Sequence, residues 1–237
     1  MSQFVKVPIA DDYKKLDALL AKFNIKRDLF NSSGASLSGG SVIQLYKSSI
    51  DEIKQANIAD LDIYLRTKQP IYVIKEIAFK LVESGYSSCN YSGNYYTKSD
   101  IYESIIRKFN KFNKAKKYNI KKTNNYFSLK KYINGIVTLY NPIIKKSIDI
   151  IITRTNIENL LIKTFDFDIV KNYINISYGN CIRMLNKTAI DNKIATMAIQ
   201  HFKSRVLDNI YEFNNFVTRY MKYTNKGQLI GIKFKHH

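Results

Sequence analysis

Two aspartates separated by one residue, Asp60 and Asp62, lie in the segment A-D-L-D-I-Y-L, where acidic and apolar residues alternate. A period of two places both carboxylates on one face of a β-strand and Leu61 and Ile63 on the opposite face. Adjacent carboxylates repel each other, so they favour a cation between them. Mg²⁺ in particular binds one or two protein carboxylates together with substrate phosphates. The spacing therefore predicts a metal-binding strand.

A glycine-serine turn, Gly39-Gly40-Ser41, stands upstream of the aspartates and opens an apolar pattern with helical spacing. The first turn of a helix has backbone N–H groups without intrahelical acceptors, and it lies at the positive end of the helix dipole. Such a helix start is a favourable site for a phosphate group. A phosphate-binding turn combined with metal-binding carboxylates is the equipment for transferring a nucleotidyl or phosphoryl group.

Together these two features resemble the signature of the DNA polymerase β-like nucleotidyltransferase superfamily. That signature is a Gly-Gly/Ser or Gly-Ser turn, a helix, and then Asp-hydrophobic-Asp/Glu-hydrophobic on a strand. The matching residues are Gly39, Gly40, Ser41, Asp60 and Asp62. The spacer between the two parts, residues 42–59, is longer than the family's usual spacing. We interpret the excess, around residues 47–57, as either an extra helical turn or a surface insert.

The resemblance implies a third carboxylate on a later strand, and Asp149 is the candidate. It is the only charged residue in the otherwise β-branched segment S-I-D-I-I-I-T, where a charge is costly unless it is paired, exposed or bound to a cation. The alternative is an edge-strand aspartate that faces water. Asp166 and Asp168 alternate in the same way and form a rival metal pair. No glycine-serine helix start precedes them, so we rank them second and treat that segment as structural.

The segment R-Y-M-K-Y-T-N-K-G near the C-terminus resembles the Arg-x-x-Lys-Tyr-x-x-Arg-Gly motif that closes some nucleotidyltransferase-like proteins. The matching residues are Arg219, Lys222, Tyr223, Lys226 and Gly227, with lysine in place of the second arginine. The resemblance implies that this cluster faces nucleotide phosphates, and the alternative is the basic end of a surface helix. The predicted nucleotide-binding set is therefore Gly39, Gly40, Ser41, Lys222 and Tyr223.

The chain of 237 residues carries a formal net charge of +19, which favours polyanionic partners. Residues 104–148 contain no acidic residue and are rich in lysine. Cations that follow a backbone, together with aromatic rings that stack on bases, suit single-stranded nucleic acid. The predicted nucleic-acid-binding residues are Arg107, Lys108, Lys111, Lys114, Lys116, Lys117, Lys121 and Lys122. The alternative is a solvated basic loop whose aromatic residues anchor it to the core.

The patterns predict an α/β (α+β) fold, in which a small mixed sheet with flanking helices carries the three aspartates. We expect a core over residues 1–185, with the basic aromatic insert at about 104–132, and a C-terminal helical region over residues 186–237. The N-terminal segment lacks a signal-peptide core, and no apolar run is long enough to span a membrane. We therefore expect an intracellular protein, cytoplasmic or nuclear, with no membrane partner.

The predicted function is metal-dependent transfer of a nucleoside monophosphate from an NTP to a nucleic-acid end, with RNA favoured. Asp60, Asp62 and Asp149 are the predicted catalytic and metal-binding residues, and Mg²⁺ or Mn²⁺ is the predicted cofactor. Two alternatives stay open. One is a catalytically inactive relative that binds nucleic acid or a protein partner. The other is an enzyme that nucleotidylates a protein or a small molecule.

Overall fold

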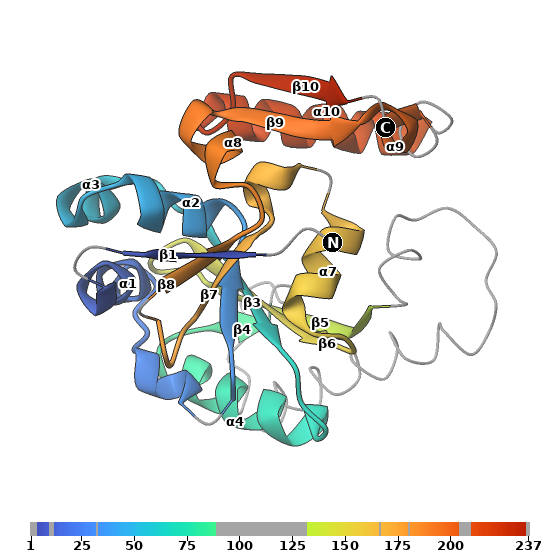
Figure 1. The fold of residues 1–237 in the computed structure, drawn as a ribbon. Helices are drawn as coiled ribbons and strands as arrows, with labels where there is room; N and C mark the ends of the chain where they lie inside the picture. The colour runs from blue at the N-terminus through green and yellow to red at the C-terminus, as the bar shows by residue number, and fades with distance from the viewer. Residues whose placement is uncertain are drawn as a thin grey trace, which may run out of the picture.

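The computed structural model describes residues 4–9, 12–31, 33–88, 132–165, 167–179, 181–203 and 210–235 (Figure 1). An eight-stranded mixed sheet runs through the molecule in the order β1-β8-β7-β2-β3-β6-β5-β4. Its strands are β1 (Val5–Pro8), β2 (Ser36–Ser38), β3 (Asp60–Leu65), β4 (Ser87–Ser88), β5 (Ile133–Asn141), β6 (Lys146–Thr153), β7 (Asn172–Asn175) and β8 (Cys181–Met184). Strands β3 and β6 pair in parallel, and the other pairs are antiparallel. The predicted mixed sheet is confirmed, and it is larger than expected.

The central strands β3 and β6 direct apolar side chains to one face of the sheet and the three aspartates to the other face. Leu61 and Ile63 of β3 and Ile148 and Ile150 of β6 are fully buried and belong to the main hydrophobic core. The residues between them point to the opposite face, because side chains alternate along a strand. The strand period therefore directs Asp60 and Asp62 away from the core, as the sequence predicts.

The helices that precede or flank the central strands follow their sequence signals. They are α1 (Asp12–Ala21), α2 (Gly40–Lys47), α3 (Ile50–Gln55), α4 (Pro70–Glu83) and α7 (Ile157–Thr164), with short 3₁₀ turns η1 (Arg27–Phe30) and η2 (Asp168–Val170). Helix α4 starts with Pro70 and ends before Gly85, whose φ is +88°, a pattern that suits a helix start and stop. In the described part of the chain, no helix is long and apolar enough to cross a membrane.

The long spacer between the glycine-serine turn and the aspartates contains a second short helix, α3. Ser49 caps it, since the Ser49 hydroxyl accepts from the Glu52 N–H and the Glu52 carboxylate accepts from the Ser49 N–H. This reciprocal capping box satisfies two backbone donors at the helix start. The extra residues thus fold as a helix, and the strand that follows begins at Asp60.

The C-terminal region contains the expected helices and also two strands that the sequence analysis did not predict. Its elements are α8 (Lys187–Asn192), β9 (Ile194–Ala198), α9 (Ile199–Phe202), α10 (Ile210–Asn225) and β10 (Gly231–Lys235). Lys193 has a φ of +57°, which ends α8, and Ile194 then pairs in parallel with Gly231. The helical region expected from the sequence includes residues 194–198, but this distant pairing partner makes the segment a strand. The division into a core over residues 1–185 and a C-terminal region over residues 186–237 stays a prediction.

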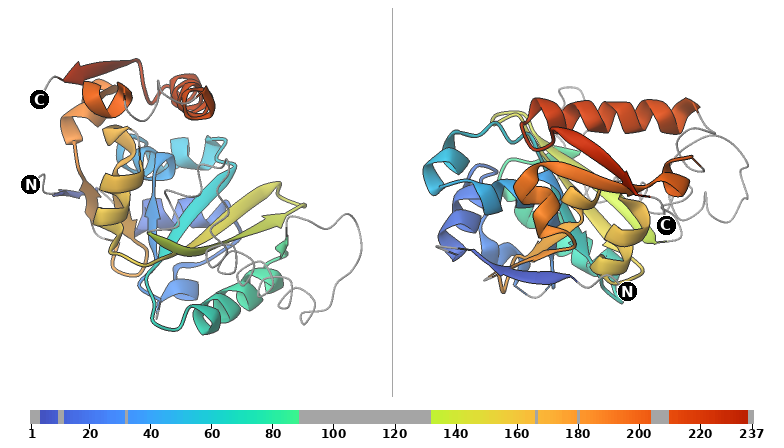
Figure 2. Two further views of the ribbon diagram at one scale, coloured as in Figure 1. Left: turned by 90° about the vertical axis from the view of Figure 1, so that its right-hand side faces the viewer. Right: turned by 45° about the horizontal axis from the view of Figure 1, so that its top comes forward.

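Aromatic side chains connect these C-terminal elements to the sheet. The ring of Phe216 on α10 lies 5.1 Å from that of Phe202 and 5.2 Å from that of Phe167 (centroid to centroid). Phe167 also makes an edge contact with Tyr223 at 5.9 Å. Figures 1 and 2 show β9, α10 and β10 as a layer above the sheet. The rings hold α10 over the sheet face that carries the aspartates.

Candidate active site

The three predicted carboxylates lie on one face of the sheet. In the parallel register of β3 and β6, Asp62 is directly opposite Asp149, and Asp60 is opposite Ser147. On the other side of β6, Asp149 is opposite Thr138 of β5. Residues i and i+2 of a strand share a face, so Asp60 lies on the same face as Asp62. The sheet thus brings together residues that are far apart in the sequence.

The carboxylates of Asp62 and Asp149 are partly buried and lie close to each other and to the carboxylate of Asp60. Burial first, and then the charges of Asp149 and Asp60, raise the pKa of Asp62 to about 7, while Lys222 opposes the shift. Burial also raises the pKa of Asp149, and a hydrogen bond from the Thr138 side chain opposes this shift. Among the described residues, the buried Oδ1 of Asp149 has no hydrogen-bond partner. The site therefore favours either a proton or a cation at the carboxylates.

The glycine-serine turn lies beside the carboxylates. Gly39 has a φ of +82°, in the left-handed region that favours glycine, and it directs the chain from β2 into α2. A Cβ at Gly39 would lie 3.9 Å from Oδ2 of Asp62. The Ser41 hydroxyl donates to the Ser38 carbonyl at 3.3 Å. The start of α2, with its backbone N–H groups, is therefore adjacent to the strand that carries Asp62.

The C-terminal motif reaches the same place, 162 residues further along the chain from Asp60. Lys222 on α10 forms an ion pair with Asp60, with 3.2 Å between Nζ and Oδ2. Gln228 follows the helix and donates from Nε2 to the Gly40 carbonyl at 3.2 Å. A Cβ at Gly40 would lie 3.7 Å from Cε1 of Tyr223. The last turns of α10 therefore face both the carboxylates and the glycine-serine turn.

A polar cavity of about 290 Å³ lies between these elements. It is lined by Ser38, Gly40, Ser41, Gln44, Ala56, Asn57, Ile58, Asp60, Asp62, Lys222, Tyr223, Lys226 and Gln228. Four polar residues that line this cavity were not predicted from the sequence, and neither was Thr138 beside Asp149. The four are Ser38, Gln44, Asn57 and Gln228. Gln228 directly follows the C-terminal motif, and Thr138 alternates with buried residues on β5, so weak signals for both were present.

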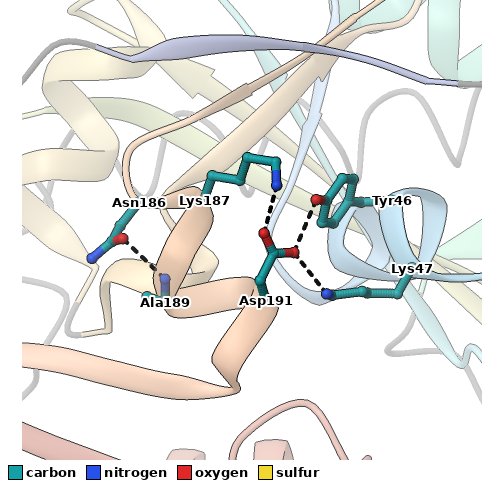
Figure 3. A network of polar contacts seen from close by, with 6 residues as sticks. All are labelled: Tyr46, Lys47, Asn186, Lys187, Ala189 and Asp191. Carbon is teal, nitrogen blue, oxygen red and sulfur yellow. Dashed lines mark hydrogen bonds and ion pairs between the residues drawn. The ribbon is translucent and has the colours of Figure 1, made fainter.

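A network of polar contacts joins α2 to the C-terminal region (Figure 3). The Asp191 carboxylate on α8 accepts from the Tyr46 hydroxyl at 2.9 Å, from Lys47 at 2.8 Å and from Lys187 at 2.5 Å. Hydrogen bonds from Lys187 and then Lys47 lower the pKa of Asp191. Since Tyr46 and Lys47 end α2, Asp191 ties the helix that starts at the glycine-serine turn to α8.

Of the rival pair, Asp168 is the member that the structure describes, and its contacts indicate a structural role. Asp168 is buried in η2, and its carboxylate accepts from the Thr196 N–H at 2.7 Å and from Nδ2 of Asn186 at 2.5 Å. Both partners belong to the C-terminal region, so Asp168 anchors β9. Asp166 lies outside the described residues. So do the predicted nucleic-acid-binding residues Arg107, Lys108, Lys111, Lys114, Lys116, Lys117, Lys121 and Lys122.

The donor set at the carboxylates fits a hard divalent cation. Asp60, Asp62 and Asp149 offer only oxygen ligands, which Mg²⁺ prefers, and one of these oxygens is buried without a partner. As the side chains lie, Asp60 is paired with Lys222. No group of three carboxylate, imidazole or thiolate side chains among the described residues is arranged as a metal cluster. Because Lys222 already pairs with Asp60, a cation at this site would compete with the Lys222 ammonium for the Asp60 carboxylate.

No protein-family model and no curated protein sequence matches this chain. Among solved structures, the chain is similar to the apo form of a CCA-adding enzyme, with a TM-score of 0.41 and 13% sequence identity. The match covers 89% of this chain and 39% of that enzyme's chain. This chain thus spans well under half of that enzyme's length. Because the similarity is weak, function is inferred below from the residues and geometry of the site.

Proposed function

We propose that this chain is a metal-dependent nucleotidyltransferase that moves a nucleoside monophosphate from an NTP to the end of a nucleic acid. One observation carries the proposal. A single polar cavity is lined by the glycine-serine turn, by two of the carboxylates and by Lys222, Tyr223 and Lys226 of the C-terminal motif. A cavity lined by both negative and positive side chains matches a triphosphate with its bound cation. The fold alone would not require these three segments to meet.

The triphosphate would lie between the start of α2 and the end of α10. Gly40 and Ser41 contribute the first N–H groups of α2, where the helix dipole favours anions. Lys222 of α10 and Lys226, the residue after this helix, also line the cavity and would neutralise the β- and γ-phosphates. Gln228 holds the Gly40 carbonyl, and this keeps the N–H groups of the turn directed toward the cavity.

Asp60, Asp62 and Asp149 would hold a divalent cation at the α-phosphate. When bound, such a cation neutralises the developing charge and lowers the pKa of the acceptor hydroxyl. In the reaction, the acceptor oxygen forms a bond to the α-phosphorus as the bond to the α–β bridging oxygen breaks, and pyrophosphate leaves. We assign to Asp149 the further role of accepting the hydroxyl proton, because its Oδ1 has no hydrogen-bond partner among the described residues.

Nucleic acid is the proposed acceptor because the chain carries a formal net charge of +19. A field of this sign attracts polyanions and raises their association rates. RNA remains the favoured acceptor. The basic residues between 107 and 122 remain the proposed backbone contacts.

The proposal is tested by incubating the purified chain with labelled NTPs, Mg²⁺ or Mn²⁺, and RNA or DNA primers. We expect primer extension that falls by at least about a hundredfold in Asp60→Ala and in Asp62→Ala, because both lose charge stabilisation of the transferred group. Asp51→Ala is the matched control, since the Asp51 side chain on α3 is 82% exposed. Absence of product with every acceptor would refute the proposed activity. Full activity of Asp60→Ala would refute the role of the carboxylates.

The ion pair between Lys222 and Asp60 favours a second candidate, a chain that binds nucleotides without transferring them. In that case the Lys222 ammonium permanently occupies the position of the cation. Equilibrium binding of a fluorescent NTP with and without Mg²⁺ separates the two candidates. Binding that Mg²⁺ strengthens, together with product formation, supports the enzyme. Binding that is independent of Mg²⁺, without product, supports the second candidate.

A further inference from the structure

Side chains on the carboxylate face form rows across β3, β6 and β5. The first row consists of Asp62, Asp149 and Thr138, and the second of Tyr64, Ile151 and Ile136. The face thus changes from polar to apolar within two residues of the carboxylates. Two residues further on, at the ends of the strands, are Arg66 and Thr153.

The second row lines an apolar cavity of about 280 Å³. Leu160 of α7 and the adjacent Phe165 contribute to its lining, as parts of a small apolar cluster that includes Tyr64 and Ile151. This cluster is separate from the one that contains the buried face of the sheet. Among the described residues, the carboxylate face therefore borders both a polar cavity and an apolar cavity.

Asp62 separates the two cavities. On β3, the polar cavity is lined by Asp60 and Asp62, and the apolar cavity is lined by Asp62 and Tyr64. Lys222 and Tyr223 of α10 line both. A phosphorus atom held at Asp62 would therefore have the polar cavity on one side and the apolar cavity on the other.

In nucleotidyl transfer the attacking oxygen and the leaving pyrophosphate lie roughly in line with the phosphorus. This inference rests on the proposed function, in which the pyrophosphate leaves from the polar cavity. The attacking hydroxyl must then approach from the side of the apolar cavity. We propose that the apolar cavity beside Tyr64, Ile136 and Phe165 receives the unpaired terminal nucleoside of a single-stranded nucleic-acid acceptor.

The size and lining of the cavity match this ligand. A volume of about 280 Å³ is at the lower end of ligand pockets, so the cavity suits one nucleoside and excludes a base pair. Aromatic side chains stack on any base, and Phe165 and Tyr64 supply aromatic walls. The cavity therefore selects for an unpaired end, with little preference among the bases.

Positive charge lies where the acceptor backbone would leave the cavity. Arg66, Lys68 and Arg154 line an open groove together with Asn134 and Thr153, and this groove continues the same three strands beyond the apolar row. Arg154 donates from Nε to the Ile133 carbonyl at 3.1 Å, which fixes its position at the edge of the cavity. We assign the phosphate that precedes the terminal nucleoside to this groove.

Ile136→Trp, which would fill the cavity, tests the proposal through separate KM values for acceptor and NTP. We expect the KM for a single-stranded primer to rise about tenfold, as for the loss of one stacked base, while the KM for NTP changes less than twofold. Ile143→Trp is the matched control, because Ile143 is 85% exposed at the β5–β6 turn. A rise in the KM for NTP alone would overturn the proposal and assign the cavity to the incoming base. Unchanged KM values for both primer and NTP would also overturn the proposal.

Arg66→Glu provides a second variant that does not alter the apolar packing. We expect it to weaken binding of a fluorescent single-stranded oligonucleotide several-fold, more strongly at low salt. Lys6→Glu is its control, because the exposed Lys6 lies on β1 at the opposite edge of the sheet. Equal effects of the two charge reversals, or equal affinity for blunt duplex and single-stranded ends, would overturn the proposal.

Photocrosslinking of the wild-type chain distinguishes failure of this inference from failure of the proposed function. The probe is a single-stranded oligonucleotide with 4-thiouridine as its terminal nucleoside, and mass spectrometry locates the crosslink. Crosslinks to β3, β5 or the end of α7 in a chain that forms no product would support the acceptor site and refute the transferase. Product formation with crosslinks elsewhere would support the transferase and overturn the acceptor site.

Discussion

Replacing Asp62 with asparagine should stabilise the metal-free protein at alkaline pH. Burial and the charges of Asp149 and Asp60 raise the pKa of Asp62 from 3.8 to about 7. The folded state therefore holds a proton between these pH values, whereas the unfolded chain has released it. Because the native state binds more protons, its stability falls as the pH rises through this range. Asp62→Asn removes this penalty while keeping nearly the same volume.

The size of the effect follows from the two pKa values. With 1.36 kcal/mol for each pKa unit, ionisation of Asp62 lowers the free energy of unfolding by about 2.5 kcal/mol between pH 5 and pH 8. The full penalty, reached well above pH 7, is about 4 kcal/mol. Asp62→Asn should lose this part of the pH dependence. Its stability relative to wild type should therefore increase from pH 5 to pH 8.

Urea unfolding at pH 5 and pH 8, in the presence of a chelator, measures this difference. Asp51→Asn is the control, because the Asp51 side chain is exposed on α3. Adding Mg²⁺ at pH 8 should stabilise wild type, since a ligand that binds only the folded state adds to its stability, and should have less effect on Asp62→Asn. A stability difference between wild type and Asp62→Asn that is the same at both pH values would refute the assigned burial and charge repulsion.

Three further substitutions test the elements that position the site. Gly39→Ala should lower the free energy of unfolding by about 1–2 kcal/mol, because φ is +82° there, and it should also weaken NTP binding. Gly231→Ala is the control in thermal unfolding, because open space surrounds Gly231. Asp168→Ala removes the acceptor of two hydrogen bonds and should lower the free energy of unfolding by about 3 kcal/mol. Amide hydrogen exchange in β9 should become faster, and an unchanged exchange rate would contradict the anchoring role of Asp168. Asp191→Ala should cost only about 1 kcal/mol, because its ion pairs are partly exposed, and high salt should reduce the difference from wild type.

Local signals in the sequence predicted the elements around the carboxylates well. Period-two alternation identified β3 and placed Asp60 and Asp62 on one face, and the β-branched run around Asp149 identified β6. Each of these signals acts within a few residues, so neighbouring side chains and backbone geometry suffice to decide the structure.

The segment from Ile194 to Ala198 shows where local signals fail. Its apolar spacing suits a helix, yet it forms β9 because β10, more than thirty residues further along the chain, pairs with it. A strand is stabilised by its partner, and the partner is not identified by the sequence of the strand itself. In such a segment, tertiary contacts outweigh the local secondary-structure propensity.

Local sequence patterns were enough to predict the glycine-serine turn, the basic C-terminal motif and the shared strand face of Asp60 and Asp62. Contacts between distant segments were needed to place Asp149 opposite Asp62, to bring Lys222 to Asp60 and to form the apolar cavity beside them. These facts depend on strand order and on how α10 packs over the sheet. The raised pKa of Asp62 belongs to the same class, because burial and nearby charges arise only when distant parts of the chain meet.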